Sequence, residues 1–233
     1  MCATVTNLYR YPVKSMGGSA EACVMLGEKG IVGDRAWALV DEERGGIKGG
    51  KRFAALMGMH ATFVTPPTAE RPSAPVNISL ADGQTTQSDD PQVNQILSAA
   101  VGAPVSLWPL LPEDQLDHYR RAPLEEGVEP GAHFRELFAR LDDEPLPDLS
   151  KFPAELFVYE SSPGTYFDAF PILLMSLEGM QKMQDFAAEN GAAANFDVRR
   201  FRPNIVVETG TPGFPESAWV GRTGKLGKAK IKV

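Results

Sequence analysis

Cysteine is scarce in this chain, and long hydrophobic runs are absent. The 233 residues include two cysteines, Cys2 and Cys23, without CxxC spacing, which argues against a disulfide framework and favours a reducing compartment. Cys23 stands between Ala22 and Val24, a context that predicts a small buried strand residue. The longest apolar stretches, such as residues 170–175, are too short to span a bilayer, and the N-terminus lacks a secretory pattern. We therefore expect a cytoplasmic protein that does not contact membrane.

Positive charge is also in short supply. Lys and Arg total 23 against 30 Asp and Glu, which gives a net charge of −7. Nucleic acids and anionic membranes are bound mainly by cationic side chains, so this balance opposes a general role in binding either. Any anion site must be local. Hydrophobic residues make up 43% of the chain, which is typical of a folded protein, and the length allows one large β domain or two smaller ones.

Short strand-like runs separated by glycine turns fill the first part of the chain. The gaps between them are too short for crossover helices, so we expect antiparallel strands there. Asp82-Gly83 marks a hairpin, and a helix is predicted to begin near Asp89 and to end at Gly102. The strands predicted in this part are 4–11, 20–26, 36–41, 60–65, 76–80 and 84–88.

The second part of the chain follows a segment rich in proline and acid. This segment, 111–151, is interpreted as a connector with one short helix around 134–141. It divides the chain into domains at 1–110 and 152–233, although a long insertion within one domain is the alternative. In the second domain Ser176 is expected to cap a helix that Gly191 ends. The elements predicted there are strands 172–175, 205–208 and 229–233 and the helix 177–190.

Common catalytic motifs fail on inspection. Gly45 and the later Gly50-Lys51 begin like a phosphate-binding P-loop, but Arg52 occupies the position of the hydroxyl residue that would bind magnesium. The next residues read as a strand and not as a helix. The three histidines lack the HExxH spacing, and no GxSxG turn occurs. Neither nucleotide hydrolysis, a zinc site nor a serine triad is supported.

Three basic elements, each beside a turn, are more informative. In the first, Lys14 and Ser15 precede two glycines whose backbone amides suit a phosphate. In the second, alternation would place Arg35 on the same strand face as Trp37, where a buried guanidinium needs an anionic partner, either a carboxylate of the protein or a ligand. In the third, alternation would place Arg202 and Asn204 on one face, where they would jointly contact a phosphate and a flat heterocycle.

Together these elements resemble the MOSC family, which is named for the C-terminal domain of molybdenum-cofactor sulfurases and includes the amidoxime-reducing molybdenum proteins. The matching stretches occur in family order along the chain. They are 8–15, 33–37 with 40–41, Phe167-Asp168 with Pro171, 200–204, and Phe214 with Glu216 and Trp219.

The resemblance implies a mainly β fold with a few helices (α+β), in which an N-terminal β-barrel-like domain precedes an incomplete MOSC β-barrel. It also implies a molybdenum cofactor, the pterin molybdopterin, and a small-molecule substrate. The residues expected to bind the cofactor are Lys14, Ser15, Arg35, Ser176, Arg202 and Asn204. A further group, Lys51, Arg52 and Asp168, is expected to attract an anion or to order the loops nearby.

The activity implied by the resemblance is that of a molybdenum-dependent oxidoreductase that reduces N-oxygenated substrates with electrons from a partner protein, or of a sulfur-transfer protein. Relatives usually carry a cysteine in a strand-to-loop segment beyond the position of Val233, and its thiolate binds molybdenum or carries sulfur. Neither Cys2 nor Cys23 lies in a matching context. The alternative is therefore a non-catalytic protein that binds or carries the pterin phosphate.

Overall fold

The structure is a computed structural model that describes residues 3–123, 127–138, 140–146, 148, 150, 155–192 and 196–233. It has a mixed α+β fold, as the sequence predicts. The strands are β1 (Thr4–Arg10), β2 (Ser19–Glu21), β3 (Leu26–Gly27), β4 (Gly30–Ile31), β5 (Trp37–Asp41), β6 (Ile47–Lys48), β7 (His60–Phe63), β8 (Val76–Ser79), β9 (Thr85–Gln87), β10 (Val105–Pro109), β11 (Leu174–Ser176), β12 (Ile205–Glu208), β13 (Thr223–Leu226) and β14 (Ala229–Lys232). The α-helices are α1 (Val93–Val101), α2 (Leu116–Tyr119), α3 (Pro130–Leu137), α4 (Glu155–Val158) and α5 (Leu177–Glu189), and 3-10 helices occupy η1 (Ala54–Gly58), η3 (Val198–Phe201) and η4 (Pro215–Trp219).

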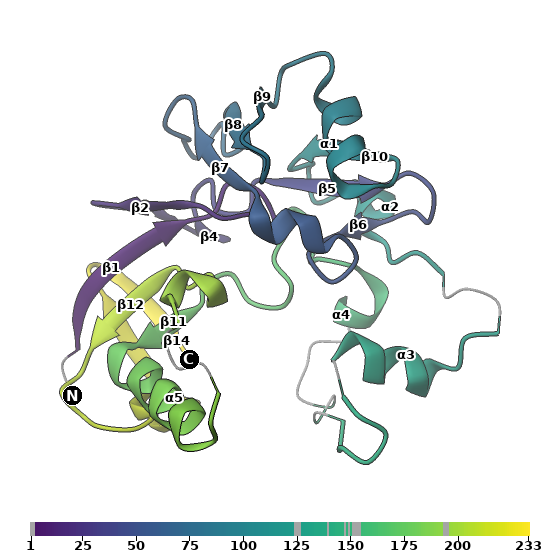
Figure 1. Cartoon of the computed structure of the whole chain (residues 1–233). Helices are drawn as coiled ribbons and strands as arrows, with labels where there is room; N and C mark the ends of the chain where they lie inside the picture. Colours follow the sequence, from purple (N-terminus) through teal and green to yellow (C-terminus); the bar gives the residue numbers. More distant parts are fainter. Residues whose placement is uncertain are drawn as a thin grey trace.

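The main hydrophobic core lies in the first part of the chain. Two three-stranded sheets, β10-β5-β6 and β7-β8-β9, surround it together with α1 (Figure 1). All strand pairs in these sheets are antiparallel, as predicted from their short connections. The helix α1 buries Val93 and Leu97 and ends at Gly102, which has the left-handed conformation that a glycine adopts without strain. Trp37 also belongs to this core, and its indole N–H donates to the Ala74 carbonyl.

A four-stranded sheet joins the beginning of the chain to its later part. Its order is β11-β12-β1-β2, and β1 is antiparallel to β12, about two hundred residues away. The strands β11 and β12 are parallel, and α5 lies between them in sequence, which is the connection that a parallel pair requires. The division into domains at 1–110 and 152–233 stays a prediction, and this sheet contains strands from both sides of it.

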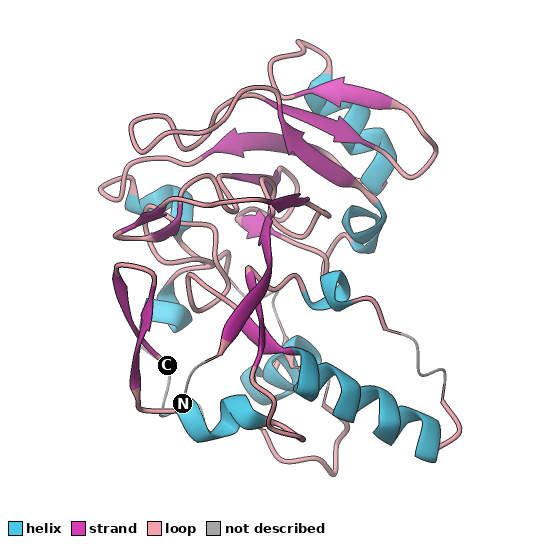
Figure 2. Ribbon diagram, turned by 90° about the vertical axis from the view of Figure 1, so that its left-hand side faces the viewer, coloured by secondary structure: helices cyan, strands magenta, loops and turns pink. Residues whose placement is uncertain are grey.

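The later part of the chain buries less apolar surface. Ser176 caps α5 by accepting a hydrogen bond from the Gly179 N–H, as predicted, and Met180 is buried against the sheet. On the same helix Phe186 is 63% exposed. The hairpin β13–β14 forms a two-stranded sheet of its own, at the lower left of Figure 2. No helix among the described residues is both long and apolar enough to cross a membrane.

The structure corrects several local predictions. Cys23 is exposed and lies outside any strand, because the predicted strand 20–26 breaks into β2 and β3. The residues after Arg52 form η1 and not a strand. The predicted helix at 134–141 is α3, which begins and ends four residues earlier. Arg35 and Arg202 both precede their strands and have left-handed backbone conformations, so strand alternation does not orient either side chain.

Candidate anion site

Lys14 provides a buried ammonium group at the end of the turn that follows β1. Its backbone N–H donates to the Trp37 carbonyl, which fixes the turn against β5. The side chain is only 8% exposed, and its Nζ donates to the Tyr166 carbonyl at 2.9 Å and to Oδ1 of Asp168 at 2.6 Å. A buried ammonium needs such partners because an unpaired charge in the interior is costly. Two segments about 150 residues apart thus meet at Lys14.

Arg35 connects the first part of the chain to the loop before β12. Its guanidinium forms an ion pair with Asp34, donates to the Arg202 carbonyl at 3.1 Å, and lies 3.4 Å from Oδ1 of Asn204. It also lies over the ring of Tyr11, 5.3 Å from the ring centre. The sequence left open whether Arg35 pairs with a protein carboxylate or with a ligand. In the structure its partner is the protein carboxylate of Asp34.

Asp34 and Tyr11 lie next to Arg35 and belong to the same cluster, although the sequence analysis did not include them among the expected site residues. The Asp34 carboxylate is buried and accepts from the Tyr11 N–H at 2.8 Å. Burial raises the pKa of Asp34, while the Arg35 charge and the Tyr11 N–H act in the opposite direction. The Tyr11 hydroxyl donates to the Pro203 carbonyl at 3.1 Å, which ties the same group to the segment before β12. The one available signal was an aspartate directly before the arginine in Gly33-Asp34-Arg35.

Arg202 differs from Arg35 in having no bonded partner for its charge. Among the described residues, its guanidinium makes neither a hydrogen bond nor an ion pair, although the residue is half-buried. Burial and the nearby positive charge of Arg35 lower the pKa of Arg202, whereas the charge of Asp168 raises it. A half-buried arginine beside another arginine is unfavourable without an anion. This arrangement is the strongest sign of an anion site in the molecule.

Asn204 anchors the loop that carries Arg202. Its side chain is fully buried, and Oδ1 accepts from the Leu173 N–H at 3.1 Å. Among the described residues, the amide nitrogen has no hydrogen-bond partner, although it lies close enough to the Asp34 carboxylate to help lower the pKa of that group. Asn204 therefore holds the start of β12 against the strand that follows Leu173.

Ser15 brings a second basic loop to the cluster. Its hydroxyl accepts from the Gly50 N–H at 2.8 Å, and a Cβ atom placed on Gly49 would lie only 2.5 Å from that hydroxyl. A side chain at Gly49 would therefore push the loop away. Lys51, which follows Gly50 in the sequence, is close enough for its charge to contribute to the lowered pKa of Asp168.

Backbone conformation marks the same positions. In the described part of the chain, the non-glycine residues with positive φ are Ser15 (70°), Arg35 (48°) and Arg202 (54°). Each is costly for a residue with a side chain, and such residues are concentrated at functional sites. Three of the six residues that the resemblance indicates thus adopt uncommon conformations, and no other described non-glycine residue does so.

Two predicted residues lie away from this group. The Ser176 hydroxyl donates to Glu216 at 2.6 Å while it caps α5, so both of its roles are occupied within the protein. Ser176 is three residues along β11 from Leu173, a separation of roughly 10 Å. Arg52 turns towards the buried Asp41, with 3.0 Å between Nε and Oδ2. As a cofactor ligand, Ser176 stays a prediction that this geometry does not favour.

The cluster as a whole is electropositive. The three cations Lys14, Arg35 and Arg202 are accompanied by two carboxylates, Asp34 and Asp168. The pKa of Asp168 is lowered first by Lys14, and further by Arg35 and Lys51, and the charge of Asp168 in turn raises the pKa of Arg202. Such a site can bind an anion, and it contains no described nucleophile or general base that is poised for chemistry on its own.

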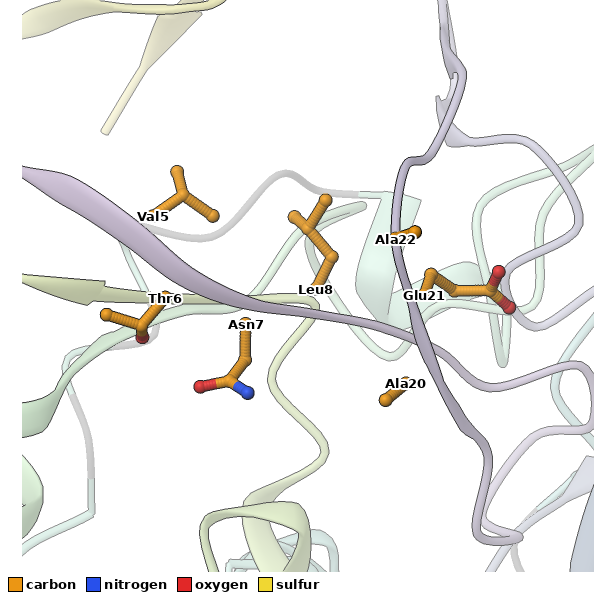
Figure 3. A pocket seen from close by; sticks show the side chains of 7 residues that line it. All are labelled: Val5, Thr6, Asn7, Leu8, Ala20, Glu21 and Ala22. Atoms are coloured by element: carbon orange, nitrogen blue, oxygen red, sulfur yellow. The ribbon is translucent and has the colours of Figure 1, made fainter.

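One hollow among the described residues lacks this chemistry, whereas another, beside the hairpin β13–β14, includes Arg222 and Lys225 in its lining. The hollow beside β1 and β2 is formed mainly by small and neutral side chains, with Glu21 as its one charged lining residue (Figure 3). Val5 and Leu8 point to one side of β1 in this view, and Thr6 and Asn7 point to the other, where a register shift interrupts the pairing with β12. Within the described residues, no group of three His, Cys, Asp or Glu side chains could hold a metal ion directly.

Comparison with known proteins assigns the first part of the chain. Residues 2–103 match the family described as MOSC N-terminal beta barrel domain, which covers Lys14, Ser15 and Arg35 but not Arg202 or Asn204. The C-terminal MOSC domain itself is not detected. No curated protein matches the chain. The chain therefore contains, over residues 2–103, a domain of the MOSC N-terminal beta barrel family.

Proposed function

We propose that the chain binds the molybdenum-bearing pterin phosphate, with the phosphate held by Arg202 and supported by Lys14, Arg35 and the turn at Ser15. The observation that carries this proposal is the half-buried guanidinium of Arg202, which has no bonded partner among the described residues. A phosphate would supply charge-assisted hydrogen bonds to it. The N-terminal domain family is consistent with this ligand because proteins that contain it are often linked to the molybdenum cofactor.

The residues fit the phosphate end of the cofactor better than its metal end. Three cations against two carboxylates leave a surplus of one positive charge, which suits an anion. Asn204 offers a buried amide next to this group. The described cysteine, Cys23, is exposed and is not among the residues of the cluster. The proposed contacts are accordingly to the pterin phosphate alone.

The finer proposal is a molybdenum-dependent oxidoreductase that reduces N-oxygenated small molecules with electrons from a partner protein, or a sulfur-transfer protein. The bound cofactor would supply the two-electron chemistry, and this chain would orient it and neutralise its phosphate. The second candidate is a non-catalytic carrier of the same pterin phosphate. The position of Cys23 outside the cluster favours the carrier, because a soft thiolate is the ligand that a molybdenum centre prefers.

The test is cofactor retention in a host that makes the molybdenum cofactor. The wild type and the variants Arg202→Ala and Arg200→Ala are purified in parallel, and bound molybdenum and pterin are measured. Arg200 is an exposed arginine two residues away and serves as the matched control for charge. We expect Arg202→Ala to weaken binding by about 1.5–3 kcal/mol, the usual contribution of a hydrogen bond to a charged group. Arg200→Ala should retain the cofactor.

Two outcomes would change this conclusion. Absence of both molybdenum and pterin from the wild type after mild purification would reject the binding function, and equal retention in the two variants would remove Arg202 from the site. Stoichiometric pterin without reductase or sulfur-transfer activity would favour the carrier over the enzyme.

A further inference from the structure

The two side chains of the Lys14–Asp168 ion pair differ greatly in their exposure to solvent. The Lys14 side chain is 8% exposed, whereas that of Asp168 is 95% exposed, yet the two charged atoms are 2.6 Å apart. Lys14 is held from the other side by the Tyr166 carbonyl. In the described part of the chain, the Asp168 carboxylate has no hydrogen-bonded partner other than Lys14. The lysine is therefore fixed, and the carboxylate is bound through one contact that faces solvent.

The Asp168 carboxylate lies where an anionic ligand would be expected. Its charge interacts with Lys14, Arg35 and Lys51, and it also acts on Arg202. Its charge thus acts on cations from three parts of the chain. Asp34, by contrast, is buried and is bonded to both Arg35 and the Tyr11 N–H, so it cannot leave.

Movement of the Asp168 carboxylate away from Lys14 would change the net charge of the cluster. With Asp168 in place, Lys14, Arg35 and Arg202 exceed Asp34 and Asp168 by one positive charge. With the carboxylate swung away, the excess becomes two. A phosphate monoester carries about −1.5 to −2 at neutral pH. It would therefore neutralise the vacated site, and its several oxygens allow contacts to more than one cation, which a singly charged group with one binding edge cannot make equally well.

We infer that Asp168 is a built-in competitor that occupies the anion position and is displaced from Lys14 by the phosphate of the ligand. This inference rests on the proposed pterin-phosphate function and adds how that site selects its ligand. Because breaking the Lys14–Asp168 pair costs energy, only a ligand that repays it at two cations binds well. Asp168 thus sets a preference for doubly charged phosphate groups over weakly charged anions.

The inference predicts the sign of one substitution. Asp168→Asn keeps the size of the side chain and removes the competing charge, so the affinity for inorganic phosphate at pH 8 should rise by about fivefold or more at low salt, as expected for removing a like charge a few ångströms away in water. If Asp168 instead positions Lys14 or contacts the ligand, the affinity should fall. The two readings predict opposite changes.

A matched control separates the local effect from net charge. Glu113 is also an exposed acid with one lysine partner, Lys29, and its ion pair involves neither Lys14 nor Arg202. Glu113→Gln changes the net charge by the same amount and should leave phosphate binding within about twofold of the wild type. The dissociation constants of all proteins for inorganic phosphate are measured by isothermal titration, and thermal unfolding confirms that each variant is folded.

The outcomes distinguish this inference from the proposed function. If Asp168→Asn binds phosphate more tightly than Glu113→Gln does, the role of Asp168 as a competitor is supported. If its phosphate affinity is equal to or lower than that of Glu113→Gln, this role is rejected, while the proposal of cofactor binding is unaffected. If neither the wild type nor Asp168→Asn binds phosphate, both the competitor and the anion site are rejected. Retention of pterin by the wild type, measured separately, reports on the proposed function alone.

Discussion

The first 110 residues and the residues from 155 onward differ in how they bury apolar side chains. The first region encloses a cluster in which Leu39, Ile78 and Leu97 are fully buried. In the later region large apolar side chains remain at the surface. Leu177, Phe186, Phe214 and Val220 are all exposed there. Among the described residues, no core cluster consists only of residues from this later region.

This difference in packing indicates which region of the chain holds the anion site rigid. The later region is attached through β12, which pairs with β1, and through Val206, which packs with Tyr9 and Tyr11. Arg202 and Asn204 lie directly before β12. The site is therefore located at the junction, where the well-packed region positions residues from the weakly packed one. Substitutions at the junction should affect both stability and binding.

The largest effect is expected from Arg35→Ala. This variant removes the partner of the buried Asp34 carboxylate and two bonds to the loop before β12. Leaving a buried charge unpaired typically costs about 3–5 kcal/mol, so the free energy of unfolding should fall by that order in urea titrations. For Arg202→Ala, which removes no described hydrogen bond or ion pair of the guanidinium, we expect cofactor retention to fall more than stability.

Two truncated side chains, one in each region, test whether the regions differ in packing. Leu39→Ala, in the first region, should lower the free energy of unfolding by about 2–5 kcal/mol because it leaves a cavity in a closed core. Phe186→Ala, on the exposed face of α5, should change it by less than about 0.5 kcal/mol. Chemical denaturation of both variants measures the difference. Equal losses would show that α5 is covered in solution.

Ser176→Ala sharpens the distinction between structural and binding residues. The variant removes the cap of α5 and the bond to Glu216, and loss of such a cap costs about 1 kcal/mol. Thermal unfolding should detect this loss, while phosphate affinity should remain that of the wild type. A drop in affinity without a drop in stability would restore Ser176 to the site.

The smallest effect is expected in the hairpin β13–β14. Lys225 and Lys230 lie directly opposite each other there, and like charges in that position repel. Lys225→Glu should therefore stabilise the protein by about 0.2–1 kcal/mol, and Lys225→Gln should give about half of that gain. The gain should shrink in high salt, because screening weakens exposed pairs. Differential scanning calorimetry at two salt concentrations measures it.

Sequence patterns predicted the elements well where local rules decide them. The hairpin at Asp82-Gly83, the end of α1 at Gly102 and the cap of α5 at Ser176 all depend on nearby residues, and all three are present. The fold class was implied by the resemblance to the MOSC family. The orientation of Arg35 and Arg202 was not predicted, because both residues have left-handed conformations that a period-two pattern cannot express.

The candidate site was predictable only in part. The resemblance indicated Lys14, Arg35 and Arg202. Their contacts join residues about 150 to 170 positions apart, Lys14 to Asp168 and Arg35 to Arg202, and no local pattern encodes such pairings. Asp34 was missed because its importance depends on burial. Ser176 was included by resemblance, and its position beside Glu216 shows that a residue can match a family pattern while its side chain serves the helix that follows.

The most direct test of the central claim is the position of a bound phosphate in a crystal of this protein soaked with methyl phosphate. We expect phosphate oxygens within hydrogen-bonding distance of the Arg202 guanidinium and of Lys14 Nζ, with the Asp168 carboxylate turned away from the lysine. A phosphate bound instead only by the exposed lysines of β13–β14, with the Lys14–Asp168 pair intact, would contradict this expectation.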